Sequence, residues 1–228
     1  MVYDHKLARE MISSGYEEEL DKMIEAVNIT KAFNNEAVVS DFNIKIEKGD
    51  FIAITGESGK GKTTILNMLG LLEKPDFGEV IVEGVVNLSR KEIMMAQRHQ
   101  FGYLFQNYAL IENETVEANL KIALEYRKGV NKKSLMKEAL HFVNLNSATL
   151  SKKIYQLSGG EQQRVAIARL FLKEADYVFA DEPTGNLDEK NRDVVFELLV
   201  KLNEMGKAVI FVTHDLELAE KANRWIKL

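Results

Sequence analysis

The chain has 228 residues, of which 46% are hydrophobic, and this length and composition suit one α/β domain with an inserted helical lobe. Its formal net charge of −5 argues against non-specific attraction to nucleic acid or anionic lipid, so we expect no nucleic-acid partner. The absence of cysteine excludes disulfides and thiolate metal sites, and it fits a reducing cytosolic environment.

Residues 1–22 are strongly charged and contain few apolar side chains, so we interpret them as an N-terminal extension with a short polar helix. This segment lacks the apolar core of a signal peptide. No apolar run in the chain approaches the roughly 20 residues that a membrane-crossing helix needs. We therefore expect a soluble domain over residues 23–228, which takes part in any membrane process through a partner protein.

Alternating apolar residues next predict two strands, at 24–30 and 42–46. Residues 51–55 are a short buried-strand candidate that runs directly into glycines, and helical spacing takes over at 62–72. Turn residues then lead to a further strand at 79–83. Strands that alternate with helices in this way favour a parallel sheet.

The segment Gly56-Glu57-Ser58-Gly59-Lys60-Gly61-Lys62-Thr63 stands between this buried strand and this helix, and it fits the pattern G-x-x-x-x-G-K-[ST]. Its glycines allow backbone N–H groups to wrap phosphate oxygens, and the helix adds its positive end. We expect Lys62 to reach the β- and γ-phosphates and Thr63 to ligate Mg²⁺, with the binding segment extending to Thr64. The alternative is a glycine-rich turn with a chance lysine. The motif alone does not choose among kinases, GTPases and motor ATPases.

The middle of the chain is mostly helical in its apolar spacing, and we expect a helical lobe over about 95–165. Within it, residues 127–137 carry five basic side chains and no acidic one. We interpret this run as a solvated loop and helix face rather than a binding patch.

The segment Ser158-Gly159-Gly160-Glu161 opens the next predicted helix. Ser158 and Glu161 fit the capping-box pattern S-x-x-E, which is the plain structural interpretation. A capping box needs no double glycine, however, and Gly159 and Gly160 leave bare N–H groups at a positive helix end where an anion can bind. Because the phosphate cradle already encloses one face of a triphosphate, this anion can be the γ-phosphate held by a second protomer.

Residues 177–180 form an apolar strand that ends in two carboxylates, Asp181 and Glu182. Ligands bind at the carboxyl ends of strands in open α/β sheets, so Asp181 is placed to hold the Mg²⁺ shell and Glu182 to polarise an in-line water. The alternative is a solvated acidic loop. A helix at about 189–203 and a strand at 207–213 continue the α/β pattern.

Taken together, these segments resemble the ABC (ATP-binding cassette) ATPases over almost the whole span 24–228, and residues 158–164 resemble that family's signature motif. The resemblance implies an α/β fold with a P-loop NTPase parallel-sheet core, an N-terminal antiparallel β portion and an inserted α-helical subdomain. It also implies ATP and Mg²⁺ as cofactors and a second copy of the chain as partner. Two ATP molecules then lie between the cradle of one chain and the signature motif of the other.

Four further residues match family elements in order along the chain. By this resemblance Gln106 touches Mg²⁺ and senses the γ-phosphate, Asp188 lies in a loop that crosses the dimer, and His214 contacts the γ-phosphate and the catalytic water. Phe33 stands where the family often has a tyrosine for adenine stacking, and stacking does not require the hydroxyl. Lys62, Glu182 and His214 are the catalytic residues on this interpretation.

The stretch 181–188 resembles the subfamily of macrolide export, lipoprotein release and antimicrobial-peptide export, and 101–111 with 70–75 resemble the lactococcin-type bacteriocin exporters. This implies an ATPase subunit on the cytoplasmic face of the cell membrane that drives export of a peptide or small toxic compound through a separate integral membrane permease. The alternative is an ATP-driven regulatory module that transmits force without moving cargo. A nucleic-acid or ribosome ATPase is disfavoured because coiled-coil insertions and a second cassette are lacking.

The residues after Gln106 are aromatic and aliphatic in a short, loop-like stretch, 107–112. Exposed apolar clusters with polar rims are candidate interfaces, so we predict that Tyr108 and Leu110 contact the permease. The alternative is that both side chains pack within the helical lobe.

Overall fold

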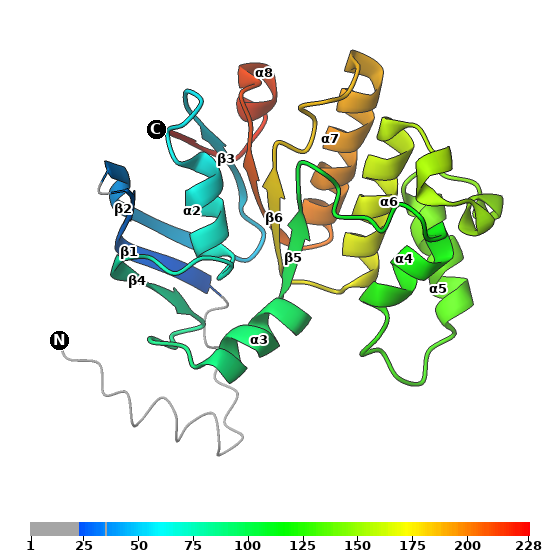
Figure 1. Ribbon diagram of the computed structural model, residues 1–228, viewed down its shortest axis with the longest axis horizontal. Coiled ribbons are helices and arrows are strands. Elements are labelled where there is room, and N and C mark those ends of the chain that lie inside the picture. The colour runs from blue at the N-terminus through cyan, green and yellow to red at the C-terminus, as the bar shows by residue number, and fades with distance from the viewer. Residues whose placement is uncertain (1–22, 35) are drawn as a thin grey trace.

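The computed structural model describes residues 23–34 and 36–228. The predicted N-terminal extension, residues 1–22, lies outside the described residues. An antiparallel sheet of three strands, in the order β2-β1-β4, stands at one side of the molecule (Figure 1). Its strands are β1 (Met23–Phe33), β2 (Glu36–Glu47) and β4 (Phe77–Val82). The expected antiparallel portion is therefore present.

A second sheet of five strands runs through the centre of the molecule in the order β5-β6-β7-β3-β8, and every neighbouring pair is parallel (Figure 1). Its strands are β3 (Phe51–Thr55), β5 (Phe101–Leu104), β6 (Tyr177–Asp181), β7 (Ala208–Val212) and β8 (Arg224–Lys227). Parallel strands end at the same edge of a sheet, so the segments that follow β3, β5, β6 and β7 gather at one edge. The predicted parallel-sheet core is confirmed.

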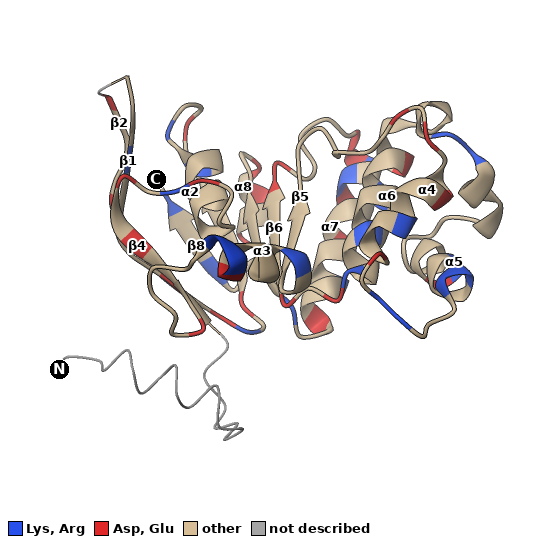
Figure 2. Cartoon of the chain, turned by 60° about the horizontal axis from the view of Figure 1, so that its bottom comes forward, with Lys and Arg blue, Asp and Glu red and all other residues tan. Residues whose placement is uncertain are grey.

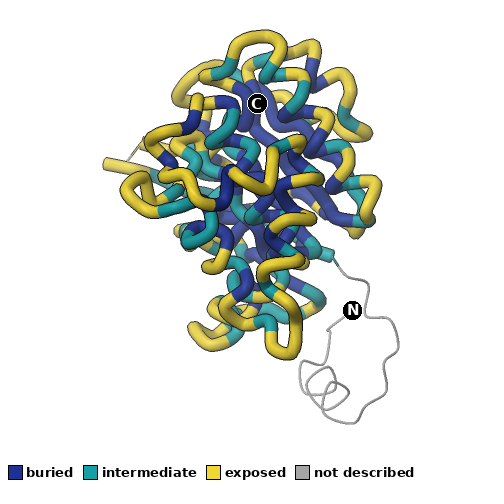
Figure 3. Tube along the Cα trace, turned by 90° about the vertical axis from the view of Figure 1, so that its right-hand side faces the viewer, coloured by how far each residue is buried: buried dark blue, intermediate teal, exposed yellow. Residues whose placement is uncertain are grey.

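The central strands are apolar along their whole length because both faces of the sheet are covered. Successive side chains point to opposite faces: Phe51 and Ala53 of β3 join one buried cluster, whereas Ile52 and Ile54 join another. The second cluster contains side chains of the antiparallel sheet and of α2 (Lys62–Leu69), and the first contains those of the helical lobe. Figure 3 shows the buried segments along the middle of the molecule and exposed loops around them.

The helical lobe consists of α4 (Val116–Ala123), α5 (Lys132–Phe142) and α6 (Gly159–Leu172), joined by the 3-10 turns η1 (Ser147–Ser151) and η2 (Ile154–Gln156). Helix α6 packs against α4 and α5 on one side and against α7 on the other, so it links the lobe to the sheet. The predicted bounds of about 95–165 also take in the strand β5, which pairs with β6 in the parallel sheet.

Besides α2, three helices in the described part of the chain lie outside the lobe. They are α3 (Arg90–His99), α7 (Glu189–Glu204) and α8 (Leu216–Ala219). Helix α3 begins with a complete capping box between Ser89 and Glu92, and α7 begins with Asp188 as its N-cap. No helix in the described part of the chain is both long and apolar enough to cross a membrane.

Candidate nucleotide site

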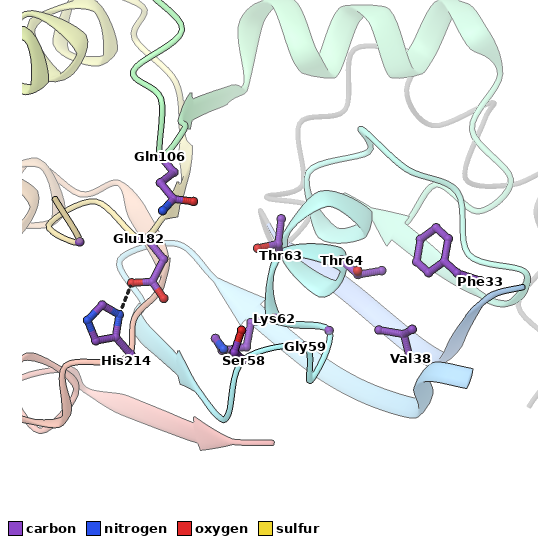
Figure 4. A pocket seen from close by; sticks show the side chains of 12 residues that line it. Phe33, Val38, Ser58, Gly59, Lys62, Thr63, Thr64, Gln106, Glu182 and His214 are labelled. Atoms are coloured by element: carbon purple, nitrogen blue, oxygen red, sulfur yellow. Dashed lines mark hydrogen bonds and ion pairs between the residues drawn. The ribbon is translucent and has the colours of Figure 1, made fainter. Parts of the chain in front are cut away.

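A cleft of about 440 Å³ opens where the carboxyl ends of the central strands meet the antiparallel sheet. Segments from across the chain meet here: the end of β1, the loop before α2, and the segments after β5, β6 and β7 (Figure 4). Its lining residues are Phe33, Val38, Ser58, Gly59, Gly61, Lys62, Thr63, Thr64, Gln106, Glu182, Gly185 and His214. All except Val38 and Gly185 were predicted from the sequence.

The loop between β3 and α2 presents backbone N–H groups to this cleft. Helix α2 begins after Gly61, and no side chain of the described residues caps its first turn, so its leading N–H groups are available to an anion. Gly61 has a φ of 78°, and a Cβ there would lie 2.8 Å from the carbonyl oxygen of Val38. Both the conformation and the packing against β2 therefore require glycine.

The ammonium group of Lys62 is held over the same loop. It donates hydrogen bonds to the carbonyl oxygens of Gly56, at 2.9 Å, and Glu57, at 2.8 Å. A lysine ammonium has three donors, so one remains for a phosphate oxygen in the cleft. Gly56 and Glu57 thus position the lysine from behind, and the N–H of Lys60 closes the loop on the Glu57 carbonyl at 3.3 Å.

Two oxygen-bearing side chains converge beside the loop. The Thr63 hydroxyl lies 3.1 Å from each carboxylate oxygen of Asp181, which ends β6. Burial raises the pKa of Asp181, while the Thr63 hydrogen bond and the Lys62 charge oppose this shift. Hydroxyl and carboxylate oxygens are the ligands that Mg²⁺ prefers, and Mg²⁺ commonly takes one or two protein carboxylates together with substrate phosphates. Gln106 lines the same cleft and offers an amide oxygen, so these residues fit Mg²⁺.

Glu182 and His214 lie opposite Thr63 across the cleft (Figure 4). The Nδ1 atom of His214 is 2.9 Å from Oε2 of Glu182, and the glutamate side chain is 17% exposed while the histidine is 69% exposed. Glu182 has a φ of 45°, and its N–H donates to the carbonyl oxygen of Val212 at 3.1 Å. A carboxylate oriented by an imidazole can accept a proton from a water molecule in the cleft.

Phe33 stands at the opposite end of the cleft, at the end of β1. Its side chain is 44% exposed, and the ammonium of Lys31 lies 5.7 Å from the ring centroid. Val38 lines the cleft beside it in Figure 4. An accessible aromatic face next to an apolar side chain suits a stacked nucleobase.

The N-terminus of α6 is built as the capping box predicts. The N–H of Glu161 donates to Oγ of Ser158 at 3.3 Å, and the Glu161 carboxylate accepts from the N–H and the hydroxyl of Ser158, each at 2.9 Å. The first of these carboxylate contacts is the main cause of the lowered pKa of Glu161. At Gly160 a Cβ would lie 2.5 Å from Oδ1 of Asn191, so a side chain there would displace the Asn191 amide on α7.

The described residues that line the cleft do not include the signature segment Ser158, Gly159, Gly160 and Glu161. Asp188 is outside the lining as well, and it caps α7 by accepting from the N–H and the side-chain amide of Asn191 at 3.0 and 2.7 Å. The structure therefore brings the cradle, Gln106, the two carboxylates and His214 together, but it leaves the signature segment on another part of the surface.

One strand of the parallel sheet ends in a phosphate cradle and a second ends in an Asp-Glu pair, and the sheet places both ends at one edge. This arrangement defines a P-loop nucleotide triphosphatase. The family model described as "ABC transporter" matches residues 39–185. The chain is 37% identical to the lipoprotein-releasing system ATP-binding protein LolD of Aquifex aeolicus, over 91% of this chain and 94% of that protein. It is 38% identical to the macrolide export ATP-binding/permease protein MacB of Campylobacter jejuni, over 90% of this chain but only 33% of that protein.

Among solved structures, a dimeric bacterial ABC transporter cassette named MJ0796 matches with a TM-score of 0.81 and 35% identity, over 90% of this chain and 94% of that one. A dimeric post-hydrolysis state of the same cassette, bound to ADP and Pi, matches equally well. The chain belongs to the ABC transporter family and is an ATPase that uses ATP and Mg²⁺.

Proposed function

We propose that this chain works as a head-to-tail homodimer that hydrolyses two ATP molecules and drives export or release of a peptide or small toxic compound through a separate membrane permease. The chain acts at the cytoplasmic face of the membrane. One observation carries the dimer: Gly159 is exposed at the N-terminus of α6, and both Gly159 and Gly160 lie outside the cleft that holds the other ATP-binding elements. A two-fold axis lets each chain supply to its partner the face that its own cleft lacks.

The residues of the cleft divide the work of hydrolysis. Lys62 and the leading N–H groups of α2 stabilise the phosphate charge, and the signature N–H groups of the second chain add to this from the opposite side. Thr63, Asp181 and Gln106 hold Mg²⁺, which when bound neutralises phosphate charge. Glu182 orients the attacking water and takes its proton. His214, 2.9 Å from Glu182, holds that carboxylate in place, and Phe33 stacks on adenine.

The predicted permease contact needs a correction. Tyr108 and Leu110 are only partly exposed and pack against the apolar core of the helical lobe, as the alternative interpretation expected. Arg169 of α6 also fixes this loop, because its guanidinium donates to the carbonyl oxygens of Ala109 and Tyr108 at 2.6 and 3.0 Å. These two side chains therefore hold the loop to the lobe, and the contact surface lies next to them.

A groove between α3, α4 and α6 provides that surface. It consists of two hollows of about 330 and 440 Å³ that share Arg98, Ala123, Tyr126 and Lys173. Phe105, which directly precedes Gln106, lines the first hollow, so a change at the nucleotide cleft reaches the groove through one peptide bond. Apolar side chains at the mouth are exposed: Ile122 by 51% and Tyr126 by 55%.

The groove is also cationic, and Figure 2 shows lysine and arginine positions along α3 and α6. Arg98 stacks on the ring of Tyr126 with its guanidinium carbon 4.1 Å from the centroid. Burial, together with the charge of Arg169, lowers the pKa of Lys173 to about 8. A partner that brings a negative charge next to Lys173 would stabilise its protonated form, so the groove favours such a partner. We infer that the permease inserts a short cytoplasmic segment with apolar side chains and at least one carboxylate.

Co-purification with the integral membrane protein encoded beside this chain tests the proposal. Ile122→Asp places a negative charge against the proposed permease segment, which itself carries a carboxylate. The variant should therefore lose co-purification and permease-stimulated ATP turnover, while the basal turnover of the free subunit stays the same. Met205→Asp, at an apolar side chain that is 54% exposed and outside the groove, is the matched control and should retain both. Full retention by Ile122→Asp would exclude the groove. Failure of the wild-type chain to bind the membrane protein would exclude the permease itself.

A further inference from the structure

A buried amide joins the signature helix to the loop that carries Glu182. Gln163 lies on α6 and is 1% exposed. Its Nε2 donates a hydrogen bond of 2.5 Å to the carbonyl oxygen of Pro183, and its Oε1 is buried with no hydrogen-bond partner among the residues that the structure describes. The acceptor oxygen of this amide is thus left without a hydrogen bond in the core. A side chain that only filled space would not need an amide here.

The carbonyl that Gln163 binds belongs to the residue directly after Glu182. Glu182 itself is in the left-handed region, with a φ of 45°, which is uncommon for a residue with a side chain and persists only when its surroundings hold it. Backbone contacts hold one side: the N–H of Glu182 donates to Val212 and its carbonyl accepts from the N–H of Gly185, both at 3.1 Å. Gln163 provides the side-chain contact to the same turn.

The other end of this link is the segment that closes the partner's site. Gln163 follows the exposed Gly159 by four residues, so it lies one helical turn behind the start of α6 and on the same face of that helix. A rigid helix transmits a displacement of its first turn directly to this position. Movement of α6 toward a nucleotide in the partner chain therefore moves the donor that holds Pro183.

A second tie connects the same two segments. Arg164, the next residue on α6, donates to Oδ1 of Asn191 at 3.0 Å, and Asn191 in turn donates to Asp188 at 2.7 Å. Gly160 packs on the side-chain amide of Asn191, and a Cβ at Gly160 would lie 2.5 Å from its Oδ1. The first two turns of α6 and the segment from Glu182 to Asp188 are thus held together at both ends of that segment.

We propose that Gln163 is a positioning residue that couples the two ATP sites of the homodimer: closure of the signature turn over the partner's nucleotide sets the Glu182 turn of the same chain in its active position. The proposal rests on the shared sites of the proposed function. Each chain senses the partner's ATP through Gly159 and Gly160, and it responds at its own Glu182 through the Gln163 amide. ATP turnover is therefore cooperative in ATP concentration.

Gln163→Met tests this coupling because methionine fills nearly the same volume and cannot donate to Pro183. We expect kcat to fall about tenfold, equivalent to about 1.4 kcal/mol in activation free energy, and the Hill coefficient for ATP to fall toward one. The KM for ATP should change less than twofold. ATP-dependent dimerisation of the Glu182→Gln background should persist when Gln163→Met is added.

Gln97→Met is the matched control, because the Gln97 amide also donates to a backbone carbonyl, that of Leu71 at 2.8 Å, and neither residue lines the cleft. It should leave kcat and the Hill coefficient unchanged. If Gln163→Met does not fold, Asn191→Ala, at a half-buried position on the second tie, takes its place with the same expected result. An unchanged Hill coefficient would overturn the coupling. A fall in kcat that is accompanied by a large rise in KM and a lower melting temperature would overturn it as well, because it would indicate general structural damage. Absence of ATP-dependent dimers in the Glu182→Gln background alone would instead overturn the shared sites.

Discussion

Replacing Glu182 by glutamine removes the proposed base and leaves the rest of the cleft in place. The glutamine side chain has the same length, and its amide still reaches Nδ1 of His214, which lies 2.9 Å from the carboxylate in the native chain. The backbone contacts of Glu182 do not involve the side chain and are retained. We therefore expect the melting temperature and ATP affinity to stay close to those of the wild type.

Hydrolysis should respond very differently. A positioned general base contributes about 10²- to 10⁴-fold, so the variant should lose about 3–5 kcal/mol of transition-state stabilisation. The mutant would bind ATP without consuming it, and because each nucleotide contacts two chains, the dimer should accumulate. Single-turnover phosphate release and size-exclusion chromatography, with and without ATP and Mg²⁺, measure the two effects. Phosphate release within about threefold of wild type would refute the role given to Glu182, since a lost base costs far more.

Three other expectations concern Asp181 and Phe33. Because burial raises the pKa of Asp181, protonation should weaken Mg²⁺ binding as the pH falls, and this weakening should begin at a higher pH than for an ordinary carboxyl. Calorimetric Mg²⁺ titrations with a non-hydrolysable ATP analogue at several pH values would show it. A pH-independent Mg²⁺ affinity would contradict this expectation. The same burial penalises the ionised carboxylate in the folded state, so Asp181→Asn should raise the melting temperature of the nucleotide-free protein at neutral pH while abolishing Mg²⁺-dependent turnover. Phe33→Ala should raise the KM for ATP several-fold with kcat unchanged, whereas Phe33→Tyr should match wild type, and equal KM values for both variants would exclude stacking.

The elements that carry the phosphate chemistry could be predicted because local sequence determines them. A cradle needs glycines followed by a lysine and a hydroxyl residue at the start of a helix, and the pattern at 56–63 contains all of these in order. Asp181 and Glu182 follow an apolar strand, and the parallel sheet brings every such strand end to one edge. Proximity of residues more than one hundred positions apart, such as Thr63 and Asp181, follows from that rule alone.

Two strands of the same sheet were missed for physical reasons. Strand β5 has only four residues, Phe101–Leu104, and it lies between helices whose periodicity dominates the surrounding window. Strand β8, Arg224–Lys227, is an edge strand with charged side chains at both ends, so its apolar content is too low to mark it. In both cases pairing with a neighbouring strand, rather than local propensity, determines the structure.

Contacts that depend on tertiary packing likewise could not be predicted from the sequence. Tyr108 and Leu110 look like surface residues in a loop, yet both are partly buried against the core of the lobe. Val38 lines the cleft only because β2 packs against Gly61, and no motif marks it. The Gln163 amide lies in a recognisable motif, but which carbonyl it binds depends on how α6 packs on the Glu182 turn. Motifs therefore identify the reacting groups, whereas the residues that position those groups are determined by tertiary packing.

Mixing two inactive variants tests the central claim, that each ATP site is shared between two chains, most directly. Lys62→Ala removes the charge of the cradle, and Ser158→Arg blocks the signature face, so each variant alone should form inactive homodimers. In an equal mixture half of the dimers pair the two variants, and each mixed dimer has one intact site, so activity should return to at most about a quarter of wild type under free exchange. Recovery that rises with mixing and saturates at or below that fraction is the expected result, because the intact site uses Glu182 of the chain whose signature face is blocked. A mixture as inactive as its components, with subunit exchange shown by a fluorescent label, would contradict the shared site.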